Sequence, residues 1–344
     1  MAIARLHSVR FMEPRDSTTT GSGQRGLAGG AIMLAPVPLG GILAFQTRSN
    51  GALGAGLHDG VAAAAIVFVI GLVLLGIGMV LIPKGRAGLH AIASSLRART
   101  MPLWMLSGGA AGALYVITQG WVGAVLGTAI FTVAAVAGQT LAGLMLDRTS
   151  ISPSGPRRLS ARRVGGALLG LVAVGVAVSH EVGGSIPPWA LLLPVIGGLA
   201  IGWQQAVNGR VGVVAGTPLT STFLNFAIGS AVLVVIVVVR GVARGFPTSL
   251  PGQAWVYLGG VTAVFFVVAA TVVVRRTGVL TLALGTVAGQ LVASLLIELI
   301  APTAGHTIGW TTVAGTALAL VAVVVATELR LTPPASRTRT RSVD

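Results

Sequence analysis

Cysteine is absent from this chain of 344 residues. Structural disulfides, thiolate metal sites and cysteine nucleophiles are therefore excluded. Charge is also scarce, because only 9% of the residues are charged, against roughly 25% in a typical soluble domain. Apolar residues make up 54% of the chain, so a soluble fold would have too little polar surface to face water. The composition favours a protein whose solvent is lipid.

Acids and lysine are rare as well. Eight acids and a single lysine, Lys84, leave a net charge of +15 that comes from arginine. Lys84 does not lie in a phosphate-binding loop, so direct use of ATP is not indicated. The five histidines are scattered without metal-ligand spacing, and the Ser and Thr residues lack a matching catalytic base. The sequence predicts no enzyme, no metal site and no cofactor.

Long apolar segments dominate what is present. A helix that crosses a bilayer needs about 20 mostly apolar residues. Ten segments reach or approach this length, at 27–46, 59–82, 103–120, 123–146, 164–180, 189–207, 219–239, 253–274, 279–300 and 309–328. The weakest division is the short turn Gly120-Trp121-Val122-Gly123. We expect an all-α integral membrane protein with ten transmembrane helices.

The basic residues between these segments indicate the orientation of the chain. Twenty of them fall on one side of the ten expected helices, and Arg48, Arg240 and Arg244 fall on the other. Cytoplasmic loops carry the excess of Lys and Arg, so the pattern predicts a multi-pass protein of the bacterial inner membrane with both termini in the cytoplasm. Residues 1–26 and 330–344 are expected to be disordered basic tails. Because the arginines are spread over short loops without interleaved aromatics, nucleic-acid binding is excluded.

Polar residues reveal an internal repeat. An offset of 158 pairs Gln46 with Gln204 and Asn50 with Asn208, and an offset of 151 pairs Gly138-Gln139 with Gly289-Gln290 and Asp147 with Glu298. The chain therefore divides into two five-helix units, 27–182 and 187–329. Because five is odd, the second unit must enter the membrane from the opposite side. Such an inverted repeat is a common architecture of secondary transporters.

The same residues carry a family resemblance. Gly40-Gly41 leads to Asn50-Gly51 with Gln46 between them, and Ala137-Gly138-Gln139 is followed by Asp147; the second copy has Gly197-Gly198, Gln204, Asn208-Gly209, Ala288-Gly289-Gln290 and Glu298. This pattern resembles the YdcZ family of inner-membrane exporters in the drug/metabolite transporter superfamily, as a fused double copy from about 28 to 328. The resemblance implies a ten-helix fold and export of small molecules, without a substrate. Arg48 departs from the mild helix end expected there.

Seven residues are candidates for a substrate path. Gln46 and Asn50 share one helical face, as do Gln204 and Asn208, because each pair is spaced i and i+4. Their alternative role is to hydrogen-bond between helices, and Asn-Gly also suits a helix C-terminus. The remaining candidates are Gln139 and Gln290, which are expected at mid-span, and Trp203, whose ring is suited to stacking on a planar or cationic ligand.

Two acids are candidates for ion coupling. An ionisable side chain at membrane depth is a functional hypothesis by default. Glu298 is followed by Leu299 and Ile300, so it is expected to lie partly within the core. Asp147 adjoins Arg148 and is expected to be solvated. A solvated interfacial position is the alternative for both.

The sequence as a whole favours a secondary exporter that works by alternating access, with the lipid bilayer and a small-molecule substrate as its partners. Two alternatives stay open, which are a flippase for lipids or lipid-linked intermediates and a non-transporting scaffold or regulatory subunit. A homodimer is also left open.

Overall fold

The computed structural model describes residues 34–179, 188–247, 249–300 and 310–326. Every assigned element in these ranges is helical, which confirms the all-α prediction. The α-helices are α2 (Pro36–Leu57), α3 (Gly60–Leu81), α4 (Pro83–Arg97), α5 (Gly108–Leu146), α6 (Ala161–Val178), α7 (Pro188–Val214), α8 (Pro218–Arg244), α9 (Leu258–Thr277), α10 (Val279–Ile300) and α11 (Trp310–Ala326). The 3₁₀ helices η1 (Leu103–Ser107) and η3 (Ala254–Tyr257) lead into α5 and α9.

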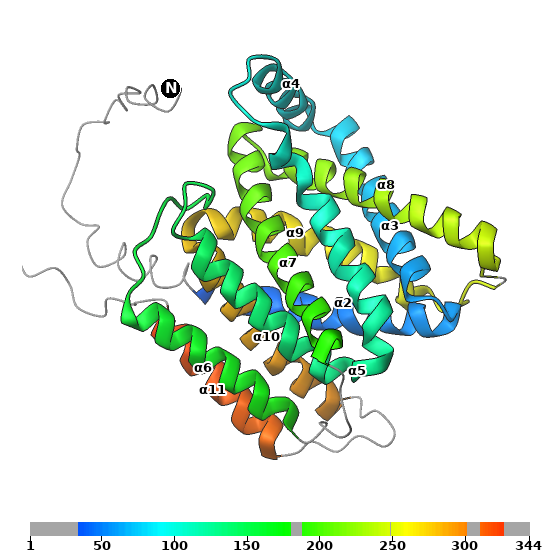
Figure 1. Ribbon diagram of the computed structural model, residues 1–344. Coiled ribbons are helices and arrows are strands. Elements are labelled where there is room, and N and C mark those ends of the chain that lie inside the picture. Colours follow the sequence, from blue (N-terminus) through cyan, green and yellow to red (C-terminus); the bar gives the residue numbers. More distant parts are fainter. Residues whose placement is uncertain (1–33, 180–187, 248, 301–309, 327–344) are drawn as a thin grey trace, which may run out of the picture.

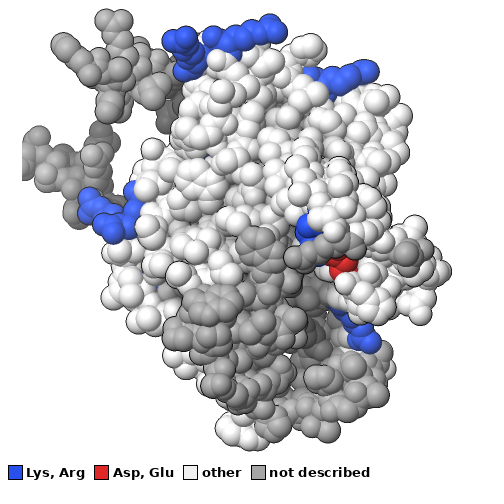
Figure 2. Space-filling view, turned by 45° about the vertical axis from the view of Figure 1, so that its right-hand side comes forward, with Lys and Arg blue, Asp and Glu red and all other residues white. Residues whose placement is uncertain are grey.

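Four helical stretches in the described residues are long and apolar enough to cross a membrane. They are Gly60–Leu81, Pro218–Ala243, Ala254–Thr277 and Val279–Ile297. Shorter apolar helices cover Leu103–Thr118, Ala134–Leu146 and Val313–Ala326. The described residues on the face in Figure 2 are mostly uncharged, with a few basic side chains and an acidic one among them. Such a surface suits lipid, and the protein is a multi-pass membrane protein.

The helix α5 spans the third and fourth predicted segments. Residues Gly108–Leu146 form one helical element of 39 residues, without a non-helical residue at the predicted turn of Gly120–Gly123. Its two ends nevertheless pack at the same level of α7, because Gly112 lies against Gln204 and Ala142 lies against Gly202. A straight helix would separate residues 112 and 142 by about 45 Å. The chain therefore doubles back within α5, and both halves lie along α7 (Figure 1).

Both Asn-Gly pairs lie inside helices, which makes the prediction of a helix end at these pairs wrong. The helix α2 continues to Leu57 and ends at His58, whose φ of 51° is left-handed. The helix α7 continues to Val214. Arg48, which the sequence places in a loop, is exposed within α2. The pattern was misread because packing against neighbours stabilises helices through Gly positions that are weak in isolation.

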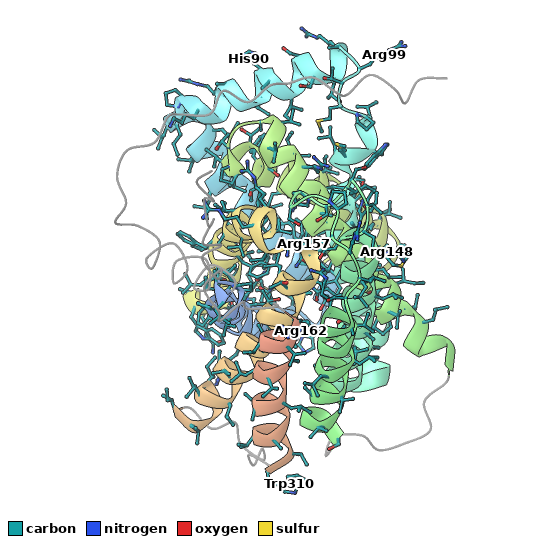
Figure 3. The ribbon with its side chains drawn as sticks, turned by 90° about the vertical axis from the view of Figure 1, so that its left-hand side faces the viewer. His90, Arg99, Arg148, Arg157, Arg162 and Trp310 are labelled. Atoms are coloured by element: carbon teal, nitrogen blue, oxygen red, sulfur yellow. The ribbon has the colours of Figure 1, made fainter. Side chains whose placement is uncertain are left out.

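The helix α4 was not anticipated by the sequence analysis, because it is too polar to cross a membrane. Its inner face buries Gly85, Gly88 and Ile92, and the Thr220 hydroxyl of α8 donates to the Gly85 carbonyl at 2.8 Å. Its outer face carries the exposed Lys84 and Arg86. Figure 3 shows His90 on this helix and Arg99 just beyond it at one end of the molecule, with Trp310 at the other.

Helix contacts recur with the two offsets of the sequence repeat. Gly71 packs on Phe226, and Gly229 packs on Phe68. The rings of Phe68 and Phe226 meet at 5.1 Å between centroids. Gly138 packs on the Val195 carbonyl, as Gly289 does on that of Val37. In consequence, the first helix of each half, α2 or α7, packs against helices of the other half, and α6 lies beside α11 (Figure 1).

These crossings predict where an added methyl group is tolerated. A Cβ at Gly289 would overlap the Val37 carbonyl oxygen, which cannot yield without moving a helix. We expect Gly289→Ala to destabilise the protein by about 1–3 kcal/mol. Gly76 has open space around its Cα, so Gly76→Ala should be neutral or stabilising by up to about 1 kcal/mol. Thermal unfolding in detergent measures both variants, and equal effects would contradict the assigned crossing of α2 and α10.

Candidate functional site

Three amide side chains form a buried polar cluster between α7 and α8. Gln204 and Asn208 lie one turn apart on α7 and are 8% and 6% exposed. Their amide nitrogens both donate to Oδ1 of Asn225 on α8, each at 3.0 Å. The Ser221 hydroxyl donates to the Asn208 carbonyl at 2.6 Å. The predicted common face of Gln204 and Asn208 is therefore present, and Asn225 joins the two residues.

Asn225 and Gln205 were missed by the sequence analysis. A signal for Asn225 existed, because α7 and α8 are joined by a short turn at 215–217. Residues equally far from such a turn lie at the same depth in a helical hairpin, and Asn208 and Asn225 are nearly equidistant from it. Gln205 carries no such signal, because depth and facing depend on which helices surround α7.

A small cavity of about 50 Å³ lies beside this cluster, between α7 and α9. Gln204 and Asn208 contribute to its wall, together with Ile201, Gln205, Phe266, Val267, Ala270 and Thr271. Gln205 and Thr271 are 7% and 2% exposed. Among these lining residues none is charged, so any ligand there would meet amides, a hydroxyl and apolar groups.

Gln46 and Asn50, the candidates of the first repeat, lie at a position comparable to that of Gln204 and Asn208. No amide joins them as Asn225 joins the second pair. Gln46 and Asn50 are half-buried on α2, and each has a buried side-chain oxygen without a hydrogen-bond partner. Asn50 lies against Gly259, just as Asn208 lies against Gly108. The residue that the offset of 158 pairs with Asn225 is Val67, so the first repeat has no bridging amide at that position.

Gln139 and Gln290 lie where helices of the two halves approach most closely. Gly198 of α7 lies against the backbone of Ala135 and Gln139, and Gly40 of α2 lies against that of Gly289 and Gln290. Both glutamines are half-buried, and neither lines the cavity. These contacts involve the backbones of the two glutamines, and a role of their side chains in a substrate path stays a prediction.

Trp203 already stacks on another aromatic side chain. Its ring centroid lies 5.5 Å from that of Trp104, at an interplanar angle of 39°. Its indole N–H donates to the Ser107 hydroxyl at 2.8 Å. These contacts fix Trp203 against η1 and leave it outside the cavity lining.

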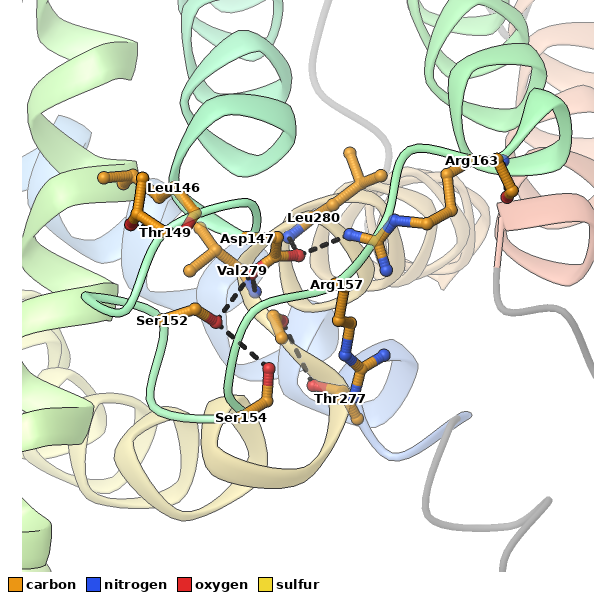
Figure 4. Close-up of polar contacts among 12 residues, drawn as sticks. Leu146, Asp147, Thr149, Ser152, Ser154, Arg157, Arg163, Thr277, Val279 and Leu280 are labelled. Carbon is orange, nitrogen blue, oxygen red and sulfur yellow. Dashed lines mark hydrogen bonds and ion pairs between the residues drawn. The ribbon is translucent and has the colours of Figure 1, made fainter. Parts of the chain in front are cut away.

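Asp147 is buried at 1% exposure, so the expectation that it is solvated was wrong (Figure 4). One carboxylate oxygen pairs with the guanidinium of Arg163 at 2.5 Å. The carboxylate also accepts hydrogen bonds from the Ser152 hydroxyl at 2.9 Å and from the backbone N–H groups of Val279 and Leu280 at 2.8 and 3.2 Å. Asp147 thus caps the N-terminus of α10, where a negative charge is favoured.

This cluster ties the end of α5 to the starts of α6 and α10. The expectation that Asp147 is solvated failed because Arg163, 16 positions along the chain, supplies the countercharge. The adjacent Arg148 does not take this role. Glu298, the repeat counterpart of Asp147, lies on α10, and its side chain falls outside the described residues. In the described part of the chain no group of His, Asp or Glu is arranged to hold a metal ion.

The apolar helices define a multi-pass helical membrane protein with a buried, uncharged polar cluster. A family model described as "Putative inner membrane exporter, YdcZ" matches the chain twice, over residues 31–178 and 189–325. The chain belongs to this family, in its double-copy form. No curated protein matches it. One solved crystal structure shares the fold at a TM-score of 0.58, with 20% identity over 88% of this chain and 96% of that one.

Two ion pairs among the described residues predict different consequences when they are broken. Arg163 is 4% exposed, so Arg163→Met leaves Asp147 buried without its countercharge and should cost about 3–5 kcal/mol. The pair of Arg240 with Asp59, at 3.2 Å, has side chains 37% and 23% exposed. Arg240→Met should therefore cost at most about 1 kcal/mol.

Thermal unfolding in detergent distinguishes the two variants. The double variant Asp147→Asn, Arg163→Met should recover part of the loss, because it removes both charges together. A similar loss from Arg163→Met and Arg240→Met would show that burial does not set the strength of these pairs.

Proposed function

We propose that this protein is a secondary transporter that exports a small molecule across the bacterial inner membrane by alternating access. The observation that carries the proposal is the amide cluster of Gln204, Asn208 and Asn225, buried in a bundle that belongs to a family of exporters. A polar group in hydrocarbon costs several kcal/mol, roughly 2–7, unless it is paired. Polar residues inside a membrane bundle are therefore candidates for a substrate path.

The alternating-access part of the proposal rests on the repeat. We assign ten membrane crossings to α2, α3, the two halves of α5, and α6 to α11, as two five-helix units of opposite orientation. Reciprocal contacts support a two-fold relation between the units, because Gly108 meets Asn208 where Gly259 meets Asn50. Two like units that exchange conformations open a central site first to one side and then to the other.

The energy source that we propose is a proton gradient. Ion coupling is assigned to Glu298 and no longer to Asp147, because the contacts of Asp147 are those of a helix cap and a buried ion pair. Uphill transport in proteoliposomes without any ion gradient would refute this part of the proposal.

The orientation of the chain can be tested cleanly because the native chain has no cysteine. Ala98 and Gly252 are both exposed, and we place Ala98 in the cytoplasm and Gly252 outside. A membrane-impermeant maleimide should label Gly252→Cys in intact spheroplasts. It should label Ala98→Cys only after the membrane is permeabilised. The reverse pattern would refute the cytoplasmic termini.

Export itself is tested by the solutes that cells release. Cells that overproduce the protein should accumulate at least one metabolite in the medium, as measured by untargeted mass spectrometry. The double variant Gln204→Leu, Asn208→Leu should lower that release about tenfold, since it removes two polar side chains of the proposed path and the hydrogen bonds that hold Asn225 in place. Gln253→Leu is the control, because Gln253 is exposed on the approach to η3.

The alternatives give other outcomes in the same cells and in proteoliposomes. A scaffold would leave release unchanged in every variant, including Gln139→Ala with Gln290→Ala. A flippase would scramble a fluorescent phospholipid in proteoliposomes while soluble metabolites stay inside the cells. Release that persists in the Gln204→Leu, Asn208→Leu variant would contradict the assigned path.

A further inference from the structure

The helix α4 begins where an apolar span ends. The span α3 ends at Leu81, and α4 starts at Pro83 after the single extended residue Ile82. The chain beyond α4 enters another apolar helical stretch, Leu103–Thr118. A polar, amphipathic helix between two such segments is typical of the interface between membrane and water. We therefore place α4 at the surface of the bilayer.

The inner face of α4 is packed against the bundle. Gly85, Gly88 and Ile92 are buried on this face, and their spacing puts them on one side of a helix. A Cβ added at Gly88 would overlap the Thr220 side chain of α8. Ile92 also shares a buried apolar cluster with Met101, which holds the segment after α4 beside the helix. This packing fixes the direction of the opposite face, which is open to the surroundings.

Exposed basic side chains occupy that outer face and the ends of α4. They are Lys84, Arg86, His90, Arg97 and Arg99, and Figure 3 shows His90 and Arg99 at this end of the molecule. Arg86, His90 and Arg97 share one helical face, because they are spaced i, i+4 and i+11. The segment 83–100 contains no acid, and the ion pairs found among the described residues involve other arginines. The surface therefore has a positive potential that attracts anions.

Exposed apolar side chains border this basic surface. Leu81 and Ile82 are exposed directly before α4, and Leu103 is exposed shortly after it. At the end of a membrane span, such side chains contact the acyl chains of lipids. A ligand that contacts both surfaces must combine an anionic group with a long apolar part. An anionic phospholipid has this chemistry, whereas a soluble anion would use the basic surface alone.

The second half of the chain has no such surface. By the repeat, the connection between α3 and η1 corresponds to the connection between α8 and η3, residues 245–253. That connection is Gly-Phe-Pro-Thr-Ser-Leu-Pro-Gly-Gln, without a basic residue. Because the two connections are expected on opposite sides of the membrane, an interaction with anionic lipid through α4 belongs to one leaflet only.

We propose that the outer face of α4 binds the headgroups of anionic phospholipids. The lipid phosphate accepts charge-assisted hydrogen bonds from the guanidinium groups of Arg86 and Arg97. Lys84 and Arg99 add positive charge at the two ends of the helix, and the acyl chains lie against Leu81. This surface is separate from the amide cluster, and it does not depend on what the protein transports.

Thermal unfolding of the purified full-length protein in detergent tests the proposal. Phosphatidylglycerol should raise the Tm, since a ligand that binds the folded state stabilises it. Phosphatidylcholine with the same acyl chains should leave the Tm unchanged, because its headgroup has no net charge. In the triple variant Lys84→Gln, Arg86→Gln, Arg97→Gln the affinity for phosphatidylglycerol should fall about a hundredfold, at about fivefold for each basic side chain. Without lipid the variant should keep the native Tm, because the three side chains are exposed.

A matched control removes the same number of charges from another part of the chain. Arg148, Arg158 and Arg162 are also exposed, and they lie outside α4. The triple variant Arg148→Gln, Arg158→Gln, Arg162→Gln should respond to phosphatidylglycerol like the native protein. An equal loss in both triple variants would overturn the proposal, because attraction would then depend on total charge and not on α4.

Salt and inorganic phosphate separate a lipid headgroup from other sources of stabilisation. Raised salt should weaken the response of the native protein to phosphatidylglycerol, because exposed charges are screened. Inorganic phosphate should leave the Tm unchanged, because it has no acyl chain to place on the apolar border. Stabilisation by inorganic phosphate equal to that by phosphatidylglycerol would overturn the assignment to lipid. An equal response to phosphatidylcholine and phosphatidylglycerol would overturn it as well.

Discussion

Polar groups inside this bundle have to find their partners within the protein, because hydrocarbon supplies no hydrogen bonds. Asp147 meets that constraint with four partners, which come from Ser152, Arg163 and the first two residues of α10. The side-chain oxygen of Asn225 meets it by accepting from both Gln204 and Asn208. The first arrangement joins the two halves of the chain, and the second organises the centre of the second half around a cavity.

Glycine makes these arrangements possible by allowing helix backbones to touch. Gly198 and Gly40 bring α7 against α5 and α2 against α10, and small residues at such crossings are how membrane helices associate. The first helix of each half therefore packs against a helix of the other half. The two repeats share this frame but differ in polar content, since Asn225 stands where the first repeat has Val67. Equivalent positions of the two halves therefore differ in the hydrogen bonds that they can form.

Several features could be predicted from the sequence because they depend on composition and period. The apolar segments 59–82 and 279–300 match α3 and α10 to within a residue at either end, since length and hydropathy alone set a helix in lipid. The spacing of Gln204 and Asn208 placed both on one face, where the structure has them. The helix ends at Asn50 and Asn208 were placed wrongly, because the turn preference of Asn-Gly is weaker than packing in the middle of a bundle.

By itself, the sequence determined that the chain is helical, lies in a membrane, repeats once and belongs to a family of exporters, because each of these is recorded in residue type and spacing. Only the tertiary structure decided which polar residues are paired. It gave Asp147 its salt bridge with Arg163 and gave Gln204 and Asn208 a common partner in Asn225. The physical reason is that hydrogen bonds between helices depend on distances that join residues far apart in the chain, and no local pattern encodes those distances.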